Sequence, residues 1–171
     1  MPIDSASGSV RGFYAGRMSL AVRTAVFPPD ATAVGVLVGA YLRQTETEKV
    51  QRGLAAETFA ERYAQEIDDP ATAFADRRVL LATIDGAEVG LVVASTDPRG
   101  TDLSRLWTDP LARGRGVGSA LLSAAVAEAA RPVRLSVWEW REPALRMYRA
   151  AGFEDVPSWD ERPGLVCLEL R

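Results

Sequence analysis

Hydrophobic and polar residues alternate over several short stretches of the chain, and each stretch predicts a strand. The clearest pair, residues 78–84 and 88–95, is joined by Asp85-Gly86, which is typical of a two-residue hairpin turn. The same pattern predicts further strands over residues 18–27, 103–108, 133–140, 153–156 and 165–170. With the turn over residues 96–101, residues 78–108 predict three consecutive antiparallel strands.

Apolar residues at helical spacing predict helices between these strands. Pro28-Pro29-Asp30 ends the first strand and begins a helix over residues 31–44. Residues 45–75 are charged but carry Leu54, Phe59, Tyr63 and Ile67 at helical spacing. We interpret them as a second helix with loose ends, and favour a solvated cover on the sheet over a substrate site.

Two more helices follow the central strands. An apolar stripe that includes Leu121, Leu122 and Ala125 predicts a helix that packs on the sheet and ends at Pro132. Pro143 suits the first turn of the last helix, and Gly152 suits the position just after its end.

The order of elements predicts an α+β fold, with a mixed, mostly antiparallel central sheet flanked by helices. At 171 residues and 47% apolar content, one domain is expected. We assign it to residues 18–171. Residues 1–17 are small, polar and glycine-spaced, and predict a disordered N-terminal extension.

The composition of the chain excludes several classes of function. A net charge of −3 and a pI near 5.1 argue against nucleic acid or an anionic membrane as partner. The chain has no histidine, which excludes His-based triads and His-ligated zinc, and no metal is expected. The single cysteine, Cys167, is interpreted as a buried apolar residue. Without a signal pattern or an apolar run of membrane-spanning length, the cytoplasm is the expected location.

The most informative segment is Leu103 to Ser119, LSRLWTDPLARGRGVGS, where an apolar strand leads through a short turn into a glycine-rich helix start. A helix N-terminus presents unpaired N–H groups and partial positive charge, so it favours a phosphate. The glycines let a ligand approach the backbone, and the two arginines in the segment add charge. We therefore predict a phosphate-binding site here.

Two common phosphate sites fit less well. A Walker loop needs Gly-Lys-Ser/Thr, whereas Gly118 is followed by Ser119-Ala120. Gly114-x-Gly116-x-x-Ser119 nearly matches the dinucleotide fingerprint, with Glu139 at a suitable offset. However, residues 109–113 separate the strand from the first glycine, and too little chain follows for the remaining βα units.

The pattern Arg113-x-x-Gly116-x-Gly118 after a strand ending in Leu106-Trp107-Thr108 closely resembles the acetyl-coenzyme A site of the GNAT superfamily of N-acetyltransferases. Downstream, residues 144–153 resemble the family's closing helix with its A-x-x-x-Y…GF pattern. One position departs from the family's pattern, since Arg141 stands where the family often has Asn. The resemblance is strong over residues 103–154, moderate over 79–102 and weak before that.

The resemblance implies a GNAT-like fold in which the strands at 103–108 and 133–140 separate, exposing backbone for the pantetheine arm. It implies that acetyl-CoA, as co-substrate, contacts Leu106, Trp107, Thr108, Arg113, Gly114, Arg115, Gly116, Val117, Gly118 and Ser119. Tyr148 is the candidate catalytic residue, donating a proton to the leaving thiolate. A backbone N–H near Thr108 is expected to hold the oxyanion.

The general base is left open. The candidate carboxylates are Glu139, Asp109, Asp155, Asp160 and Glu161, and a water chain is the alternative. Four tryptophans are expected around the site and would give a partly aromatic acceptor pocket: Trp107, Trp138, Trp140 and Trp159.

These observations together predict an N-acetyltransferase that moves an acetyl group from acetyl-CoA to a primary amine, most simply on a small molecule. A protein N-terminus or lysine is the alternative acceptor. A catalytically silent coenzyme A-binding sensor is the alternative from another class. The acyl chain length stays open, as does the oligomeric state, with a homodimer as one option.

Overall fold

A computed structural model describes residues 18–54 and 61–171. The N-terminal extension expected over residues 1–17 lies outside the described residues, and so does Phe59 of the predicted second helix. No helix in the described ranges is both long and apolar enough to cross a membrane.

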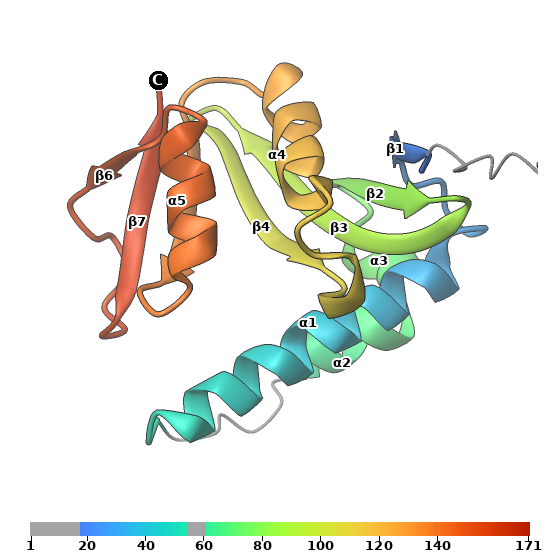
Figure 1. The fold of residues 1–171 in the computed structure, drawn as a ribbon, viewed down its shortest axis with the longest axis horizontal. Coiled ribbons are helices and arrows are strands. Elements are labelled where there is room, and N and C mark those ends of the chain that lie inside the picture. Colours follow the sequence, from blue (N-terminus) through green and yellow to red (C-terminus); the bar gives the residue numbers. More distant parts are fainter. Residues whose placement is uncertain (1–17, 55–60) are drawn as a thin grey trace, which may run out of the picture.

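The described strands form one seven-stranded sheet in the order β1-β2-β3-β4-β5-β7-β6 (Figure 1). Its strands are β1 (Leu20–Thr24), β2 (Arg78–Ile84), β3 (Ala87–Asp97), β4 (Gly100–Thr108), β5 (Val133–Trp138), β6 (Glu154–Val156) and β7 (Leu165–Leu170). Neighbouring strands are antiparallel except β4 and β5, which pair in parallel. The predicted mixed, mostly antiparallel sheet is confirmed.

Turn residues fix two of the connections as the sequence predicts. Asp85 and Gly86 have φ of 50° and 87°, as a two-residue hairpin between β2 and β3 requires. Gly152 follows the last helix with φ 92°, a conformation that glycine adopts without a steric cost.

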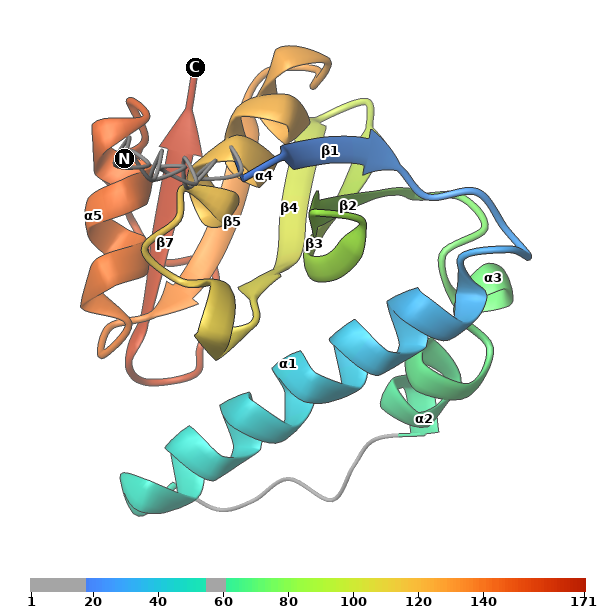
Figure 2. The ribbon, with the colours of Figure 1, turned by 45° about the vertical axis from the view of Figure 1, so that its right-hand side comes forward.

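The helices are α1 (Ala31–Gln51), α2 (Glu61–Asp68), α3 (Pro70–Ala73), α4 (Val117–Ala127) and α5 (Glu142–Ala150), with a 3-10 turn at Pro110–Ala112. Figures 1 and 2 show α4 on one face of the strands β2 to β4, and α1 and α2 on the opposite face. In Figure 2, α1 runs beneath the sheet from the side of α3 towards the side of α5 and β7.

Element boundaries differ from the sequence prediction at several points, and the single helix predicted over residues 45–75 is wrong, because the described helical residues of this range belong to the end of α1, to α2 and to α3. Helix α1 continues to Gln51 instead of ending at 44. Side-chain pairs across one helical turn stabilise this extension, since Gln44 bonds to Glu48 and Lys49 to Glu46. Helix α4 ends at Ala127, before Pro132, and β5 ends at Trp138 instead of 140.

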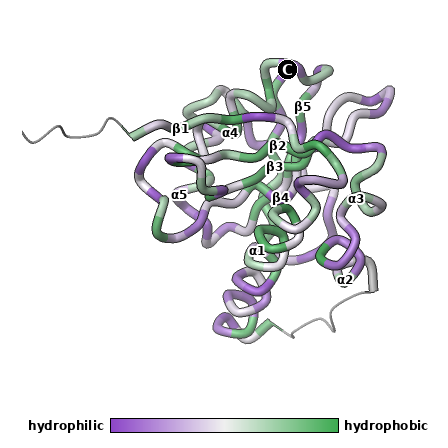
Figure 3. Tube along the Cα trace, turned by 90° about the vertical axis from the view of Figure 1, so that its right-hand side faces the viewer, coloured by the Kyte–Doolittle hydropathy of each residue, from purple (hydrophilic) through white to green (hydrophobic). Residues whose placement is uncertain are grey.

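The core has two parts, one on each face of the sheet. Leu80, Val92 and Leu103 pack with Leu121 and Leu122 of α4 on one face. The alternate residues of the same strands pack under α1, with Leu81, Leu91 and Val93 against Val34 and Val38. Figure 3 shows hydrophobic stretches in the central strands β2 and β3. Cys167 is free and 1% exposed, so its predicted burial is confirmed.

The sheet opens between β4 and β5. Their parallel pairing is limited to Thr101 with Val133 and Asp102 with Arg134. Beyond these pairs β4 stays with β3 and β5 stays with β7. The separation of these two strands that the resemblance implied is thus present.

Candidate active site

A groove of about 610 Å³ lies at the open end of β4, beside the start of α4. Every residue predicted to contact the coenzyme lines this groove except Arg115, which is exposed outside it. The opposite walls come from the C-terminal half of α1 and from α5 with the turn before it, and include Gln44, Glu48, Trp140, Arg141 and Met147. The sequence prediction therefore located one wall of the groove.

Different structural features explain why glycine stands at each position at the start of α4. Gly114 and Gly116 have φ of 75° and 80°, a backbone conformation that side chains disfavour, and a Cβ added at either would meet nothing within 4 Å. A Cβ on Gly118 would lie 3.3 Å from Met147 Sδ and 3.7 Å from Thr108 Oγ1, so it would point into the groove. The glycine turn leaves open space next to the helix start.

Helix α4 presents backbone donors to this space. Its first backbone bond inside the helix is from Ala120 N to Gly116 O. The N–H groups of the preceding helical residues, Val117, Gly118 and Ser119, have no carbonyl one turn earlier within the helix. This arrangement provides the donors and the partial positive charge that an anion requires.

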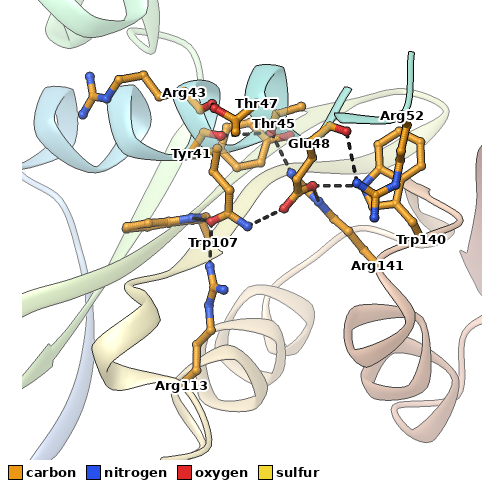
Figure 4. Close-up of polar contacts among 11 residues, drawn as sticks. Tyr41, Arg43, Thr45, Thr47, Glu48, Arg52, Trp107, Arg113, Trp140 and Arg141 are labelled. Carbon is orange, nitrogen blue, oxygen red and sulfur yellow. Dashed lines mark hydrogen bonds and ion pairs between the residues drawn. The ribbon is translucent and has the colours of Figure 1, made fainter. Parts of the chain in front are cut away.

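Arg113 connects the glycine turn to α1. Its Nη2 donates to Gln44 Oε1 at 2.6 Å and its Nε donates to the Thr108 carbonyl at 3.1 Å. Gln44 Oε1 also accepts from Trp107 Nε1 at 2.8 Å. Figure 4 shows Arg113 reaching from the turn towards α1 beside Trp107. The guanidinium thus lies along the groove wall.

A second cavity of about 360 Å³ lies between the separated strands and the helices α1 and α2. Its walls combine tyrosines, charged side chains and residues of β4 and β5, including Tyr41, Lys49, Glu66, Arg105 and Tyr148. We call it the inner pocket. Leu106 and Arg141 line both the groove and the inner pocket, so the two cavities meet at these residues.

Arg141 occupies this junction and is held from α1. Its Nε donates to Glu48 Oε2 at 2.8 Å and its Nη2 donates to Thr45 Oγ1 at 2.7 Å (Figure 4). Trp140 Nε1 donates to the same Glu48 oxygen at 3.0 Å. The residue that departs from the family pattern is thus part of a polar network that joins α1 to the turn before α5.

Glu48 is ionised at neutral pH in this network. Burial alone would raise its pKa, but hydrogen bonds from Gln44, Trp140 and Arg141 outweigh burial and lower the pKa below its usual value. A carboxylate with a lowered pKa is a weak proton acceptor. Glu48 is therefore suited to holding Arg141 in place and not to acting as a general base.

Arg105 interrupts the pairing of β3 and β4 at the inner pocket. The register shifts between Leu91 and Val93, and Arg105 has φ 55°, which costs a non-glycine residue about 1–2 kcal/mol. Contacts with three residues hold it there. Its guanidinium donates to both oxygens of Glu66, at 2.8 and 2.9 Å, and lies near the rings of Tyr41 and Tyr63. Backbone strain stabilised by surrounding contacts is typical of functional sites.

Tyr148 lies in the wall of the inner pocket and is 6% exposed. Burial raises the pKa of its phenol, Tyr41 raises it further, and Arg141 opposes the shift. The hydroxyl therefore carries its proton at neutral pH, as a proton donor must.

The tryptophan prediction holds for three of four residues. Trp138 lines the inner pocket, and Trp107 and Trp140 line the groove. The rings of Trp138 and Trp140 stack with centroids 4.6 Å apart. Trp159 is 50% exposed and lines neither cavity, because it lies in the loop between β6 and β7.

The carboxylates proposed as bases do not line either cavity. Asp109 caps the 3-10 turn by accepting from Leu111 N, Asp155 pairs with Arg149, and Asp160 pairs with Arg162. Glu139 and Glu161 lie outside both linings as well. The carboxylates at the site are instead Glu46, Glu48 and Glu66.

Sequence reasoning missed these carboxylates because it interpreted residues 45–75 as a cover on the sheet. That interpretation is wrong for Thr45, Glu46, Lys49, Tyr63 and Glu66, which line the inner pocket. The polar run TETEK is as typical of a solvated helix face as of a pocket wall. Only its position beneath the opened sheet shows that it belongs to the pocket.

Comparisons with known proteins agree with this geometry. Residues 75–155 match the family model described as acetyltransferase (GNAT) domain. No curated protein matches the chain.

Many solved structures share the fold. An acetyltransferase of the GNAT family from Streptococcus pneumoniae is 20% identical, covers 89% of this chain and 99% of its own, and has a TM-score of 0.59. The GNAT domain of S. lividans PAT is 22% identical to this chain. The match covers 87% of this chain and 88% of that domain, with a TM-score of 0.60. YncA from Salmonella typhimurium, solved with its cofactor acetyl-CoA, is 16% identical, with coverage of 89% and 93% and a TM-score of 0.60.

These neighbours establish the fold, and the family model covers the segment with the glycine turn and Tyr148. The predicted resemblance is confirmed. The chain has the fold of GNAT-family acetyltransferase structures, and its residues 75–155 match the GNAT acetyltransferase domain.

Proposed function

We propose that this chain, with residues 18–171 as one domain, transfers an acetyl group from acetyl-coenzyme A to a primary amine on a small molecule. The observation that carries the proposal is the meeting of two cavities at Leu106 and Arg141. One cavity suits an extended phosphate-bearing ligand, and the other suits a compact acceptor.

The groove fits the coenzyme in shape and in charge. The open space over Gly114 and Gly116 lets a pyrophosphate approach the N-terminus of α4. The edge of β4 near Leu106, Trp107 and Thr108 has lost its pairing with β5, so its backbone groups can bond to the amides of a pantetheine arm. When bound, acetyl-coenzyme A supplies an activated acetyl thioester, and this path directs the thioester towards the junction.

Residues of this chain would then act on the reacting atoms in two ways. A backbone N–H of β4 near Thr108, on the edge that is not paired with β5, can stabilise the oxyanion that forms on the acetyl carbonyl. Tyr148 can donate its proton to the departing sulfur, since its hydroxyl is protonated at neutral pH. Water in the inner pocket is the route by which the amine loses its proton.

The size of the inner pocket favours a small acceptor over a protein chain. Its volume of about 360 Å³ lies at the lower end of the range for small-molecule sites. A protein N-terminus or lysine would have to reach the junction through it. Retention of Tyr148 at the pocket wall favours turnover over a silent coenzyme sensor.

Two measurements test the proposal. Acetyl-CoA and coenzyme A should raise Tm, because a ligand that binds only the folded state stabilises it, whereas NADH and ATP should raise Tm far less. A screen of primary amines with detection of free thiol should then identify an acetylated acceptor. Equal stabilisation by NADH would contradict the coenzyme assignment, and binding without turnover of any amine or peptide would favour the sensor.

A further inference from the structure

In the part of the chain that the structure describes, the lining of the inner pocket holds more cationic than anionic side chains, although the protein is acidic overall. Its lining includes the cationic side chains of Lys49, Arg77, Arg105, Arg141 and Arg162. Among the described residues of the lining, the carboxylates are Glu46 and Glu66. The whole chain carries a formal charge of −3, so this excess of cations is local to the pocket.

The pocket's two carboxylates are already engaged by cations. Glu66 accepts both of its bonds from Arg105, at 2.8 and 2.9 Å. Glu46 accepts from Lys49 Nζ at 3.1 and 3.3 Å, and the side chain of Lys49 is 6% exposed. The charges of these pairs offset each other, and the other cationic side chains of the wall are Arg77, Arg141 and Arg162.

Two of those arginines are oriented by carboxylates that lie outside the lining. Glu48 holds Arg141 through Nε, and Asp160 holds Arg162 through Nε and Nη2 at 2.9 and 2.6 Å. Within the described residues, the Arg141 bonds use its Nε and Nη2 towards α1, so Nη1 is available at the cavity junction. Fixed guanidinium groups of this kind recognise carboxylates well.

The same charge affects an amine in the pocket. Close to a guanidinium group of the wall, a protonated amine is repelled, which favours its neutral form, and the neutral form is the nucleophile that acetyl transfer needs. An acceptor with an amine alone has no group that these arginines can bind. An anionic group on the acceptor offsets this repulsion by contacting the arginines.

We propose that the acceptor is a small amine that also carries a carboxylate, as an amino acid does, and that the cationic wall of the inner pocket binds this carboxylate. This inference rests on the proposed acetyl transfer for its reaction but on the pocket charge for its specificity. Arg162 and Arg141 approach the pocket from the β6–β7 loop and from the turn before α5, so both could contact one small anion.

The experiment compares each of three amino acids with two neutral relatives in the presence of coenzyme. The probes are L-phenylalanine, L-methionine and L-glutamate, each against its α-carboxamide and against the amine formed by removing its α-carboxylate. The carboxamide keeps the size of the acid and has a less basic amine, so amine reactivity by itself would favour it. Binding is measured by Tm shift with coenzyme A, and kcat/KM is measured with acetyl-CoA.

For at least one of the three sets, we expect the acid to be preferred over both relatives by about tenfold or more, on the scale of one charge-assisted bond. Raising the salt concentration should weaken this preference, since screening acts on the charge and not on shape. Arg162→Gln should raise KM for the acid by about tenfold and leave KM for the carboxamide unchanged. The matched control is Arg149→Gln, because Arg149 forms a similar pair with Asp155 but lines neither cavity.

The outcomes separate the two proposals. Carboxamides or simple amines that bind and react as well as the acids in every set would overturn the carboxylate inference and leave acetyl transfer standing. A preference for the acid in binding, lost in Arg162→Gln but without turnover, would support the pocket assignment and contradict the proposed activity. Binding of no acid above its carboxamide would overturn the inference whether or not amines are acetylated.

Discussion

Arg141 and Glu48 join the turn before α5 to the C-terminal half of α1 through a 2.8 Å bond from Nε to Oε2. The two side chains are 17% and 19% exposed, so the pair is largely shielded from solvent. Because Arg141 also lines both cavities, this pair connects the position of α1 to the junction where the acetyl group would be transferred.

Removal of either partner should destabilise the protein, because the remaining charge would stay shielded without its bond. Arg141→Ala and Glu48→Ala should each lower the free energy of unfolding by about 1–3 kcal/mol. The double variant should lose less than the sum of the two, which urea denaturation of the four proteins would measure as a coupling energy. Additive losses would show that the pair contributes nothing as a pair.

Glu48 should also contribute to the acid sensitivity of the fold. Its pKa in the folded protein is below the ordinary value of 4.5, so ionised Glu48 stabilises the fold above about pH 4.5. This stabilisation is lost as the pH falls through the lowered folded pKa. Glu48→Gln should therefore lower Tm at pH 7 and flatten the fall of Tm as the pH drops below about 4.5.

The exposed Glu142 on α5 provides the control for that measurement, and Glu142→Gln should leave the acid branch of the Tm profile as it is in the wild type. An unchanged acid branch in Glu48→Gln would mean that other carboxylates account for the acid sensitivity. Asp30 and Asp160, whose pKa values fall to about 2 beside Arg23 and Arg162, would be the next to test.

Gly118→Val should obstruct coenzyme binding while leaving the fold intact. The added side chain points towards Met147 and Thr108 in the groove, and position 118 does not have the positive φ of Gly114 and Gly116. We expect Kd for coenzyme A to rise by about tenfold or more, as measured by titration calorimetry. Ala120→Val, on the same helix but outside both cavity linings, should bind coenzyme A as the wild type does.

Tyr148→Phe should lower kcat by about 10²-fold and leave Kd for coenzyme A nearly unchanged. Phenylalanine keeps the ring that packs with Phe153, whose centroid is 5.9 Å away, so the variant deletes only the hydroxyl. Steady-state kinetics with the acceptor found in the amine screen would test this. A full rate in a folded variant would remove Tyr148 from the mechanism and leave solvent as the proton donor.

The sequence predicted the parts of this protein that depend on local chemistry. Alternating residues and Asp85-Gly86 determine the β2–β3 hairpin, and the glycine pattern after Thr108 determines the turn into α4. Pro143 and Gly152 mark the ends of α5 in the same way. Each feature depends on the backbone preference of single residues or on the spacing of apolar residues nearby in the sequence. Neither needs contacts with the rest of the fold.

Only the tertiary structure decided what α1 does. Thr45, Glu46, Glu48 and Lys49 form a polar helical stretch that, by its sequence, is equally suited to contact with water. They belong to the site because α1 packs under the sheet where β4 and β5 separate, which brings Glu48 to Arg141, 93 residues away along the chain. The charge of the inner pocket arises in the same way, since its arginines come from distant segments and only the folded chain brings them together.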